Sequence, residues 1–195
     1  MHSGGSLTKY WAYGANGIKV RGLELRQHST CPWIVRLQEQ ALDLLAKSDD
    51  LIDGIPSYRV QCEVQSLLID AIQRLEHHQL LPHDLIITQR ISRKPTRHSS
   101  QTVAALAFQR SERLGFTPEL ASKVRFVICL KNTNNPIERV LLAHECETLN
   151  HPIRNIDVAH YRQLAIRAVW AILAPFGWSE EDLLETNITR LDQWM

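Results

Sequence analysis

Long apolar runs are missing from this chain of 195 residues. No stretch of about 18 apolar residues occurs, so we expect no transmembrane helix and no membrane partner. The first eleven residues, MHSGGSLTKYW, contain no apolar segment of the kind that a secretory signal needs. We therefore expect a cytoplasmic protein. The Ser-Gly-Gly-Ser stretch resembles a linker, and residues 1–6 are left out of the fold prediction.

Cysteine is scarce, and its spacing excludes the common metal and redox motifs. Cys31, Cys62, Cys129 and Cys146 lie far apart with no Cys-x-x-Cys pair, which is typical of reduced thiols in a cytosolic protein. The stretch HECETLNH, 144–151, has two histidines and one cysteine but no second pair of ligands at zinc-finger spacing. We expect no metal site there. A hydrolase using His144 and Glu145 would also need a nucleophile or metal that the spacing does not supply.

The net charge of +1 hides an alternation along the chain. Residues 1–31 carry four Lys/Arg against one Asp/Glu, and residues 85–131 carry nine against two. Residues 32–84 carry four against nine, and residues 132–195 carry five against nine. Two basic blocks therefore alternate with two acidic ones, a pattern that favours a surface facing a polyanion. The alternative is that folding intermixes the charges and leaves no patch.

Apolar periodicity predicts an α+β protein that is mainly helical. Helical spacing is found over residues 32–46, 57–78, 102–114, 157–173 and 179–184, where Pro32, Asp157 and Ser179 suit helix starts. Alternating or β-branched runs predict strands over residues 9–13, 18–26, 84–92 and 123–130. The Gly14–Gly17 stretch GANG predicts a hairpin turn between the first two strands.

Four of these segments, taken in order, resemble the C-terminal region of a family B DNA polymerase, from the palm end through the thumb. They are IKVRGLELR, DLIITQRISR, VAALAFQRSERLGF followed by KVRFVI, and IDVAHYRQLAIRAVWAILAPFGWSEEDLL. Together they cover about residues 8–185. The resemblance implies three parts: a palm-end hairpin within 1–31, a thumb-like domain over 32–185, and a tail over 186–195.

The resemblance implies a grip on primer–template DNA that does not depend on sequence. The basic cluster after the strand at 84–92 would contact phosphates, which a polymerase must hold on duplex of any sequence. The N-terminal hairpin would add contacts near the primer–template. The residues implied are Lys9, Tyr10, Lys19, Arg21, Arg90, Arg93, Lys94 and Arg97.

Three departures from the family pattern weaken this implied grip. Thr8 stands where a lysine is expected, Gln27-His28-Ser29 stand where Arg-Arg-Asp often follows, and His98-Ser99-Ser100 replace a Tyr-Lys element. A different class of function is therefore also considered. The chain would then be a stand-alone thumb-like module that binds a polymerase or another replication or repair protein.

The family's magnesium-binding motifs, Asp-x-x-Ser-Leu-Tyr-Pro and Tyr-Gly-Asp-Thr-Asp, do not occur in this sequence. Two-metal polymerisation requires such carboxylates, so we expect no catalytic residue, no bound cofactor and no activity from this chain alone. Magnesium would be held by a palm carried elsewhere. The chain would be part of a nucleotidyltransferase, either as a piece of a larger enzyme or as a subunit of a split polymerase, associated with the nucleoid if prokaryotic.

Two further contacts follow from the same resemblance. The stretch TNITRLDQWM resembles the clamp-binding box of polymerases, in which Leu191, Trp194 and Met195 would enter a pocket of a sliding clamp. Ile188 and Met195 depart from that box. Near the other end, separation from a palm would expose Trp11, Tyr13 and Trp33 as a docking face. The alternative is that these aromatic side chains pack into the core of this chain.

Overall fold

The computed structural model describes residues 10–14, 17–52, 55–91, 102–116, 118–119, 122–130, 134–147, 149 and 151–185. The chain forms two compact units. The first comprises Met1–Gln27, Ile34–Gln73 and Arg162–Met195, and the second comprises His28–Trp33 and Arg74–Tyr161. Helices dominate and the strands are short, so the predicted α+β, mainly helical class is confirmed. The three-part division at residues 31 and 185 stays a prediction.

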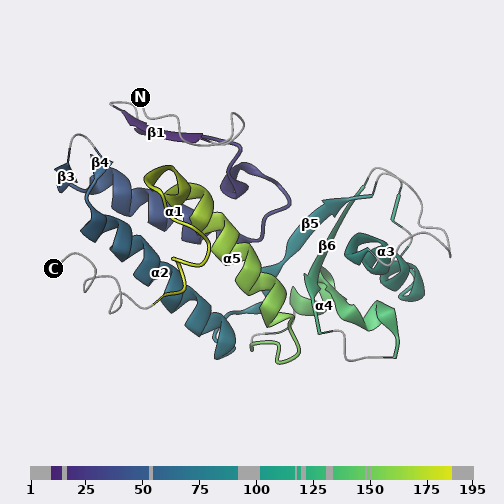
Figure 1. Ribbon diagram of the computed structural model, residues 1–195. Helices are drawn as coiled ribbons and strands as arrows, with labels where there is room; N and C mark the ends of the chain where they lie inside the picture. The colour runs from purple at the N-terminus through teal and green to yellow at the C-terminus, as the bar shows by residue number, and fades with distance from the viewer. Residues whose placement is uncertain are drawn as a thin grey trace. The chain divides into compact units, whose positions relative to one another are not determined.

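Three long helices build the first unit: α1 (Pro32–Lys47), α2 (Tyr58–Glu76) and α5 (Val158–Leu173). Their segments in this unit lie side by side (Figure 1). Each follows the predicted period, with buried side chains three or four residues apart, such as Ile34, Leu37 and Ala41 in α1. The predicted starts are confirmed, because α1 begins at Pro32 and the Asp157 carboxylate accepts the His160 N–H at 2.9 Å.

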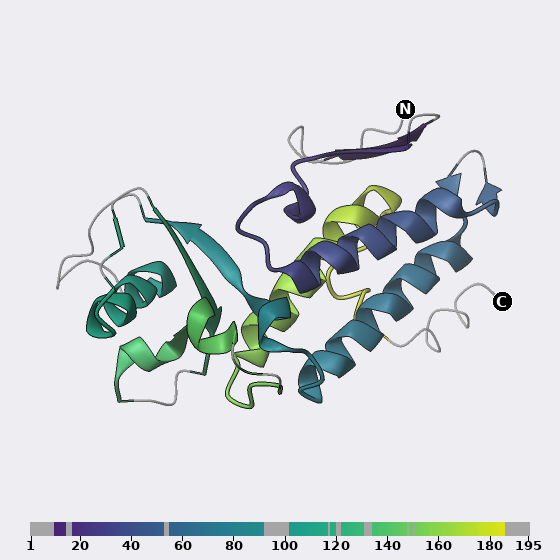
Figure 2. The same ribbon diagram turned by 180° about the vertical axis from the view of Figure 1, so that it is seen from behind.

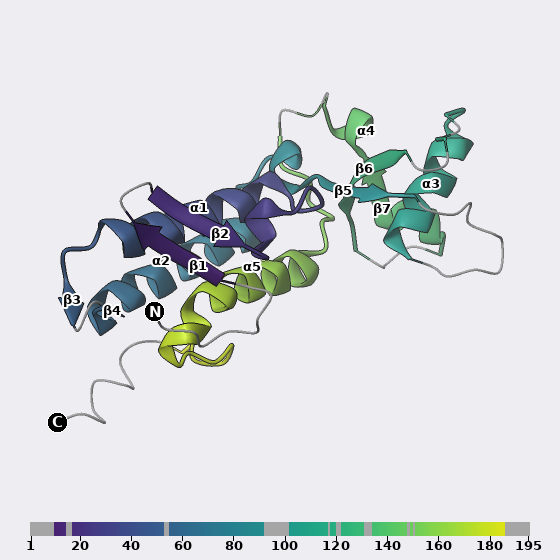
Figure 3. The ribbon, with the colours of Figure 1, turned by 90° about the horizontal axis from the view of Figure 1, so that it is seen from above.

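Two hairpins complete the first unit. Strands β1 (Tyr10–Gly14) and β2 (Gly17–Arg21) pair antiparallel, and the view from above shows them lying over the helices (Figure 3). Strands β3 (Leu51–Ile52) and β4 (Ile55–Pro56) form a shorter hairpin that the sequence did not predict. The predicted strand over 18–26 is wrong beyond Arg21. Gly22 takes a φ of 73°, and a 3-10 helix, η1 (Glu24–Arg26), follows.

The predicted helix over 179–184 is also wrong, although its cap forms. The Ser179 hydroxyl accepts the Asp182 N–H at 3.1 Å, and the Asp182 carboxylate accepts the Ser179 N–H at 2.7 Å. The buried Gln65 amide then donates to the carbonyls of Asp182 and Glu185, both at 2.8 Å. These carbonyls bond to a side chain of α2, and the segment is a turn instead of a helix. A 3-10 helix, η4 (Ala174–Phe176), precedes it.

The second unit is an antiparallel sheet with helices beside it, and Figure 2 shows it from behind. The strands β5 (Ile87–Arg90), β6 (Lys123–Ile128) and β7 (Val140–Leu142) lie in the order β5-β6-β7. Helix α3 (Val103–Arg113) packs on β6 and β7, and the short α4 (Ala143–Glu147) follows β7. Two 3-10 helices, η2 (Pro82–Leu85) and η3 (Pro136–Arg139), precede β5 and β7.

The buried Tyr161 links two segments of this unit through hydrogen bonds. Its hydroxyl accepts the Ile128 N–H at 3.0 Å and donates to the Leu85 carbonyl at 2.8 Å. Burial raises the pKa of Tyr161 well above its usual value, so the group stays a neutral donor. Among the helices within the described ranges, none is long and apolar enough to cross a membrane.

Candidate nucleic-acid interface

The β1–β2 hairpin of the first unit has one anchored face and one basic face. Lys19 pairs with Ala12 and Arg21 pairs with Tyr10, so Lys19 and Arg21 point to the same side of the ribbon. Both side chains are exposed. Trp11 belongs to the other side, where its indole N–H donates to the Ile172 carbonyl of α5 at 3.3 Å. The hairpin therefore presents its two cations away from the helix that anchors it.

A buried amide fixes the chain directly after this hairpin. Gln38 of α1 is fully buried, and its oxygen accepts the Leu25 N–H at 2.7 Å. Its nitrogen donates to the Glu24 carboxylate and to the Ala168 carbonyl, both at 2.8 Å. Together with buried Leu23, these bonds hold the Leu23-Glu24-Leu25 segment, which follows the hairpin, against α1 and α5. Sequence reasoning missed Gln38, because only its burial distinguishes it from the exposed glutamines nearby.

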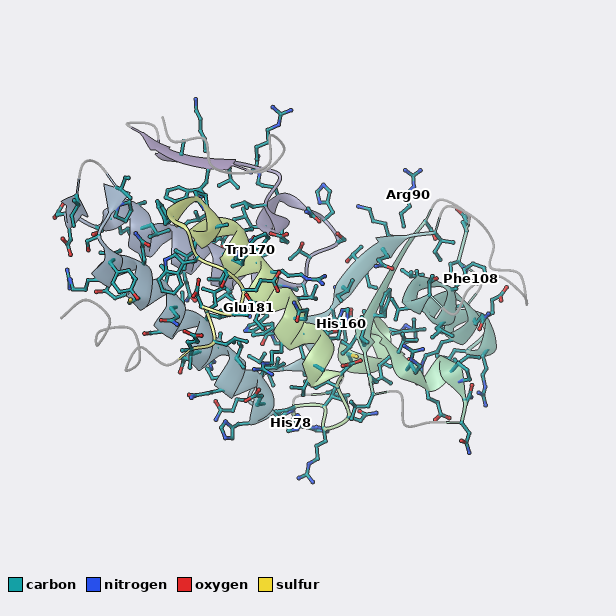
Figure 4. The ribbon with its side chains drawn as sticks, viewed as in Figure 1. His78, Arg90, Phe108, His160, Trp170 and Glu181 are labelled. Atoms are coloured by element: carbon teal, nitrogen blue, oxygen red, sulfur yellow. The ribbon has the colours of Figure 1, made fainter. Side chains whose placement is uncertain are left out.

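In the second unit, the end of the β5–β6 ladder brings cations together. Arg90 lies directly opposite Lys123, and Arg125 shares the face of Lys123 two residues further along. All three side chains are exposed, and Arg90 extends away from its strand (Figure 4). Like charges directly opposite each other are unfavourable, so this end of the sheet favours an anionic ligand. Alternation within KVRFVI was the pattern that could have identified Lys123 and Arg125.

Several predicted contacts fall outside the described residues. They are Lys9, the side chain of Tyr10, the loop residues Arg93, Lys94 and Arg97, and the clamp-box residues Leu191, Trp194 and Met195. The aromatic docking face is wrong in one part, because Trp33 is only 6% exposed. Trp11 is half-buried, with its ring edge-on to Phe176 at 6.1 Å, and the Tyr13 side chain lies outside the described part.

The residues around His144 make contacts that stabilise the fold. Two guanidinium nitrogens of Arg110, Nε and Nη2, donate to the Glu145 carboxylate at 2.6 Å each, and the Leu142 N–H donates to it at 2.9 Å. Burial alone would raise the pKa of Glu145, but the bonds from Arg110 and Leu142 outweigh it and lower that pKa. The carboxylate is therefore occupied as an ion-pair partner.

Neighbouring thiols are buried and reduced. Burial raises the pKa of Cys129 to about 12 and that of Cys146 to about 11, which keeps both protonated. Over the part of the chain that the structure describes, no group of three or more His, Cys, Asp or Glu side chains is placed to hold a metal ion. His144 instead packs against Phe116, with ring centroids 5.2 Å apart.

Comparisons with known proteins agree on one family. The chain matches the family model described as DNA polymerase family B over residues 6–176. A DNA polymerase of Archaeoglobus fulgidus is 21% identical over 189 residues, which cover 91% of this chain and 23% of that protein. The family B DNA polymerase of the hyperthermophilic archaeon Pyrobaculum calidifontis has a similar fold, with a TM-score of 0.64 and 18% identity over 88% of this chain and 21% of that one. The chain thus spans less than a quarter of the length of these relatives.

Proposed function

The chain belongs to DNA polymerase family B, and on this premise we propose that it acts as the thumb region of such a polymerase, holding primer–template duplex through its phosphates. The observation that carries the proposal is the basic face of the β1–β2 hairpin. Lys19 and Arg21 are exposed on one side of a ribbon whose other side is anchored on α5. Cations held in this way gain free energy by releasing counterions from the duplex.

Contacts of this kind suit a polymerase, because phosphates are present at every sequence. Lys19, Arg21 and Arg90 would each reach one phosphate, and Lys9, Arg93, Lys94 and Arg97 would add to them. None of these roles needs a base-specific hydrogen bond. The proposed grip is therefore independent of sequence and sensitive to salt.

Catalysis requires a second component in this proposal. The family's two magnesium-binding motifs are absent from the sequence, and the described residues bring together no set of carboxylates that fits the ions. The residues present do not fit the metal, so we derive no chemical step in this chain. We infer that magnesium is bound by a palm on another chain or on another part of the same protein.

The test is the salt dependence of binding to generic duplex DNA. A plot of log affinity against log salt concentration should have a slope of about −0.9 per phosphate that the whole chain contacts. The double variant Lys19→Ala, Arg21→Ala should flatten this slope by the equivalent of about two phosphate contacts, whatever the sequence of the duplex. Lys47→Ala is the matched control, because Lys47 is exposed in the same unit but paired with Asp43 at 2.7 Å. Absence of duplex binding by the unmodified chain at about 50 mM salt would refute the proposal.

A further inference from the structure

Strand β6 is paired along only part of one side. Residues 123–126 of β6 pair with β5, but β7 pairs only with Phe126, Val127 and Ile128. Strand β7 ends at Leu142, and the chain turns into α4 at Ala143. Within the described ranges, no strand lies beside Lys123–Arg125 on the β7 side. This leaves a short open edge in the second unit.

The ladder pattern identifies which backbone groups face this open edge. Ile91 N–H donates to the Ser122 carbonyl at 3.0 Å, and Cys129 N–H donates to the Arg139 carbonyl at 2.8 Å. Successive residues of an inner antiparallel strand direct their N–H and C=O groups to opposite neighbours. Ser122 and Val124 therefore face β5. Lys123, in step with Cys129, faces the open edge with its N–H and its C=O. Arg125 faces the same side, where the register places it opposite Ala143 at the start of α4.

A cavity of about 480 Å³ lies along this edge. Its apolar part is formed by Val124 and Leu142, which share one face of the sheet, and by Phe116 after α3. The Phe116 ring is 59% exposed, although an aromatic side chain of this size is usually buried.

Charged groups lie on the opposite face of the same strand. Lys123 and Arg125 are exposed there, and no carboxylate of the described residues lies within 4.0 Å of the Lys123 amine. Glu147 lies 3.6 Å from Arg125, and Glu119 also lines the cavity. Two cations and two carboxylates therefore line the cavity, so a ligand with a few acidic groups placed at Lys123 and Arg125 suits it better than a uniform polyanion such as nucleic acid.

We propose that this edge binds an extended peptide of a partner protein, which adds to β6 as a further strand. Backbone hydrogen bonds to Lys123 and Arg125 would supply the affinity, and alternate side chains would supply the specificity. Because side chains alternate between the faces of a strand, one apolar residue packs on the exposed Phe116, next to the buried Val124 and Leu142. Its two neighbours face Lys123 and Arg125 and are acidic. This inference does not depend on DNA binding.

The first test uses capped peptides in which three glutamates alternate with two leucines. Titration into the isotope-labelled whole chain should shift the amide resonances of Lys123 and Arg125 saturably. Two N-methylated forms, one carrying methyl groups on the leucine nitrogens and the other on the glutamate nitrogens, place the methyl groups on opposite sides of the strand. One form should lose binding and the other should retain it. Equal binding by both forms overturns the proposal, as does a lack of shifts at these amides.

Substitutions test the protein side of the contact. Arg125→Pro removes the outward N–H without touching the bonds to β5, and it should weaken binding about two- to tenfold more than Arg125→Ala. Phe116→Ala should weaken binding, whereas Leu114→Ala should not, because Leu114 is 45% exposed but does not line the cavity. If the proline variant does not fold, the proposal is decided by the N-methylated peptides and by the comparison of Phe116→Ala with Leu114→Ala.

Two other probes separate this edge from the proposed duplex site. A peptide with lysines in place of the glutamates should bind more weakly, because it places cations against Lys123 and Arg125. Equal binding by the lysine peptide overturns the inference. A result in which duplex DNA, but no peptide, shifts these two amides overturns it as well, and such a result leaves the proposed DNA grip intact.

Discussion

At the scale of single residues, Glu145 predicts how stability responds to acid. Its pKa is lowered in the folded state, so its contribution is complete above the unfolded pKa of about 4.3 and is lost as the pH falls through the folded value. Glu145→Gln should lower the free energy of unfolding by about 1–3 kcal/mol at pH 7, because Arg110 loses a charged acceptor. Denaturant unfolding of both proteins should show this difference shrinking below about pH 4.3.

The matched control for this prediction is Glu147→Gln. Glu147 is exposed and lies 3.6 Å from the exposed Arg125, and such surface pairs contribute about 0–1 kcal/mol. Its replacement should change stability little at any pH. A difference between Glu145→Gln and the unmodified chain that stays constant from neutral to acidic pH would contradict the assignment of the lowered pKa to this ion pair.

At the scale of elements, Gln38 determines whether the hairpin is held in place. Gln38→Leu keeps a side chain of similar volume but leaves the Leu25 N–H and the Ala168 carbonyl without their hydrogen-bond partner. Each buried group left unpaired costs about 1–3 kcal/mol, so we expect a loss of at least about 2 kcal/mol in unfolding free energy. Where the variant remains folded, the salt slope for duplex DNA should flatten, since Lys19 and Arg21 lie on the hairpin that the Glu24-Leu25 segment anchors.

Gln40→Leu provides the comparison, because Gln40 is exposed on the same helix. It should leave both the unfolding free energy and the salt slope nearly unchanged. A Gln38→Leu protein that is destabilised but retains the full salt slope would show that the amide stabilises the core without positioning the basic face.

At the scale of the whole molecule, the chain by itself should not incorporate nucleotides. The sequence contains neither magnesium-binding motif, and the chain spans less than a quarter of its polymerase relatives. Addition of a palm-bearing polymerase chain that lacks its own thumb should give primer extension that rises with the amount of this chain. Primer extension by the purified chain without a palm would refute the inferred division of labour.

That stimulation should also depend on the basic face. The Lys19→Ala and Arg21→Ala protein should stimulate less than the Lys47→Ala protein, and the deficit should narrow as salt is lowered, because weak screening strengthens the remaining contacts. Equal stimulation by the two variants at every salt concentration would mean that the hairpin does not hold the duplex.

The sequence by itself determined most of the helices, because the features that define them lie within a few residues of each other. Apolar spacing placed α1, α2, α3 and α5, and it did so because each helix buries one face at a period of 3.6 residues. Capping was equally local, since Pro32, Asp157 and Ser179 act within one turn of their own position. The order of the segments and their motifs also determined the family, which the comparisons confirm.

Only the tertiary structure decided the features that require distant partners. Gln38 is a buried hydrogen-bond centre because Glu24 and Ala168 meet it from other parts of the chain. The 179–184 segment is a turn because the Gln65 amide donates to the carbonyls of Asp182 and Glu185. Pairing register placed Arg90 opposite Lys123 and left the edge beside Lys123 open. Register and edges depend on which strands meet, and a local pattern of residues does not contain that information.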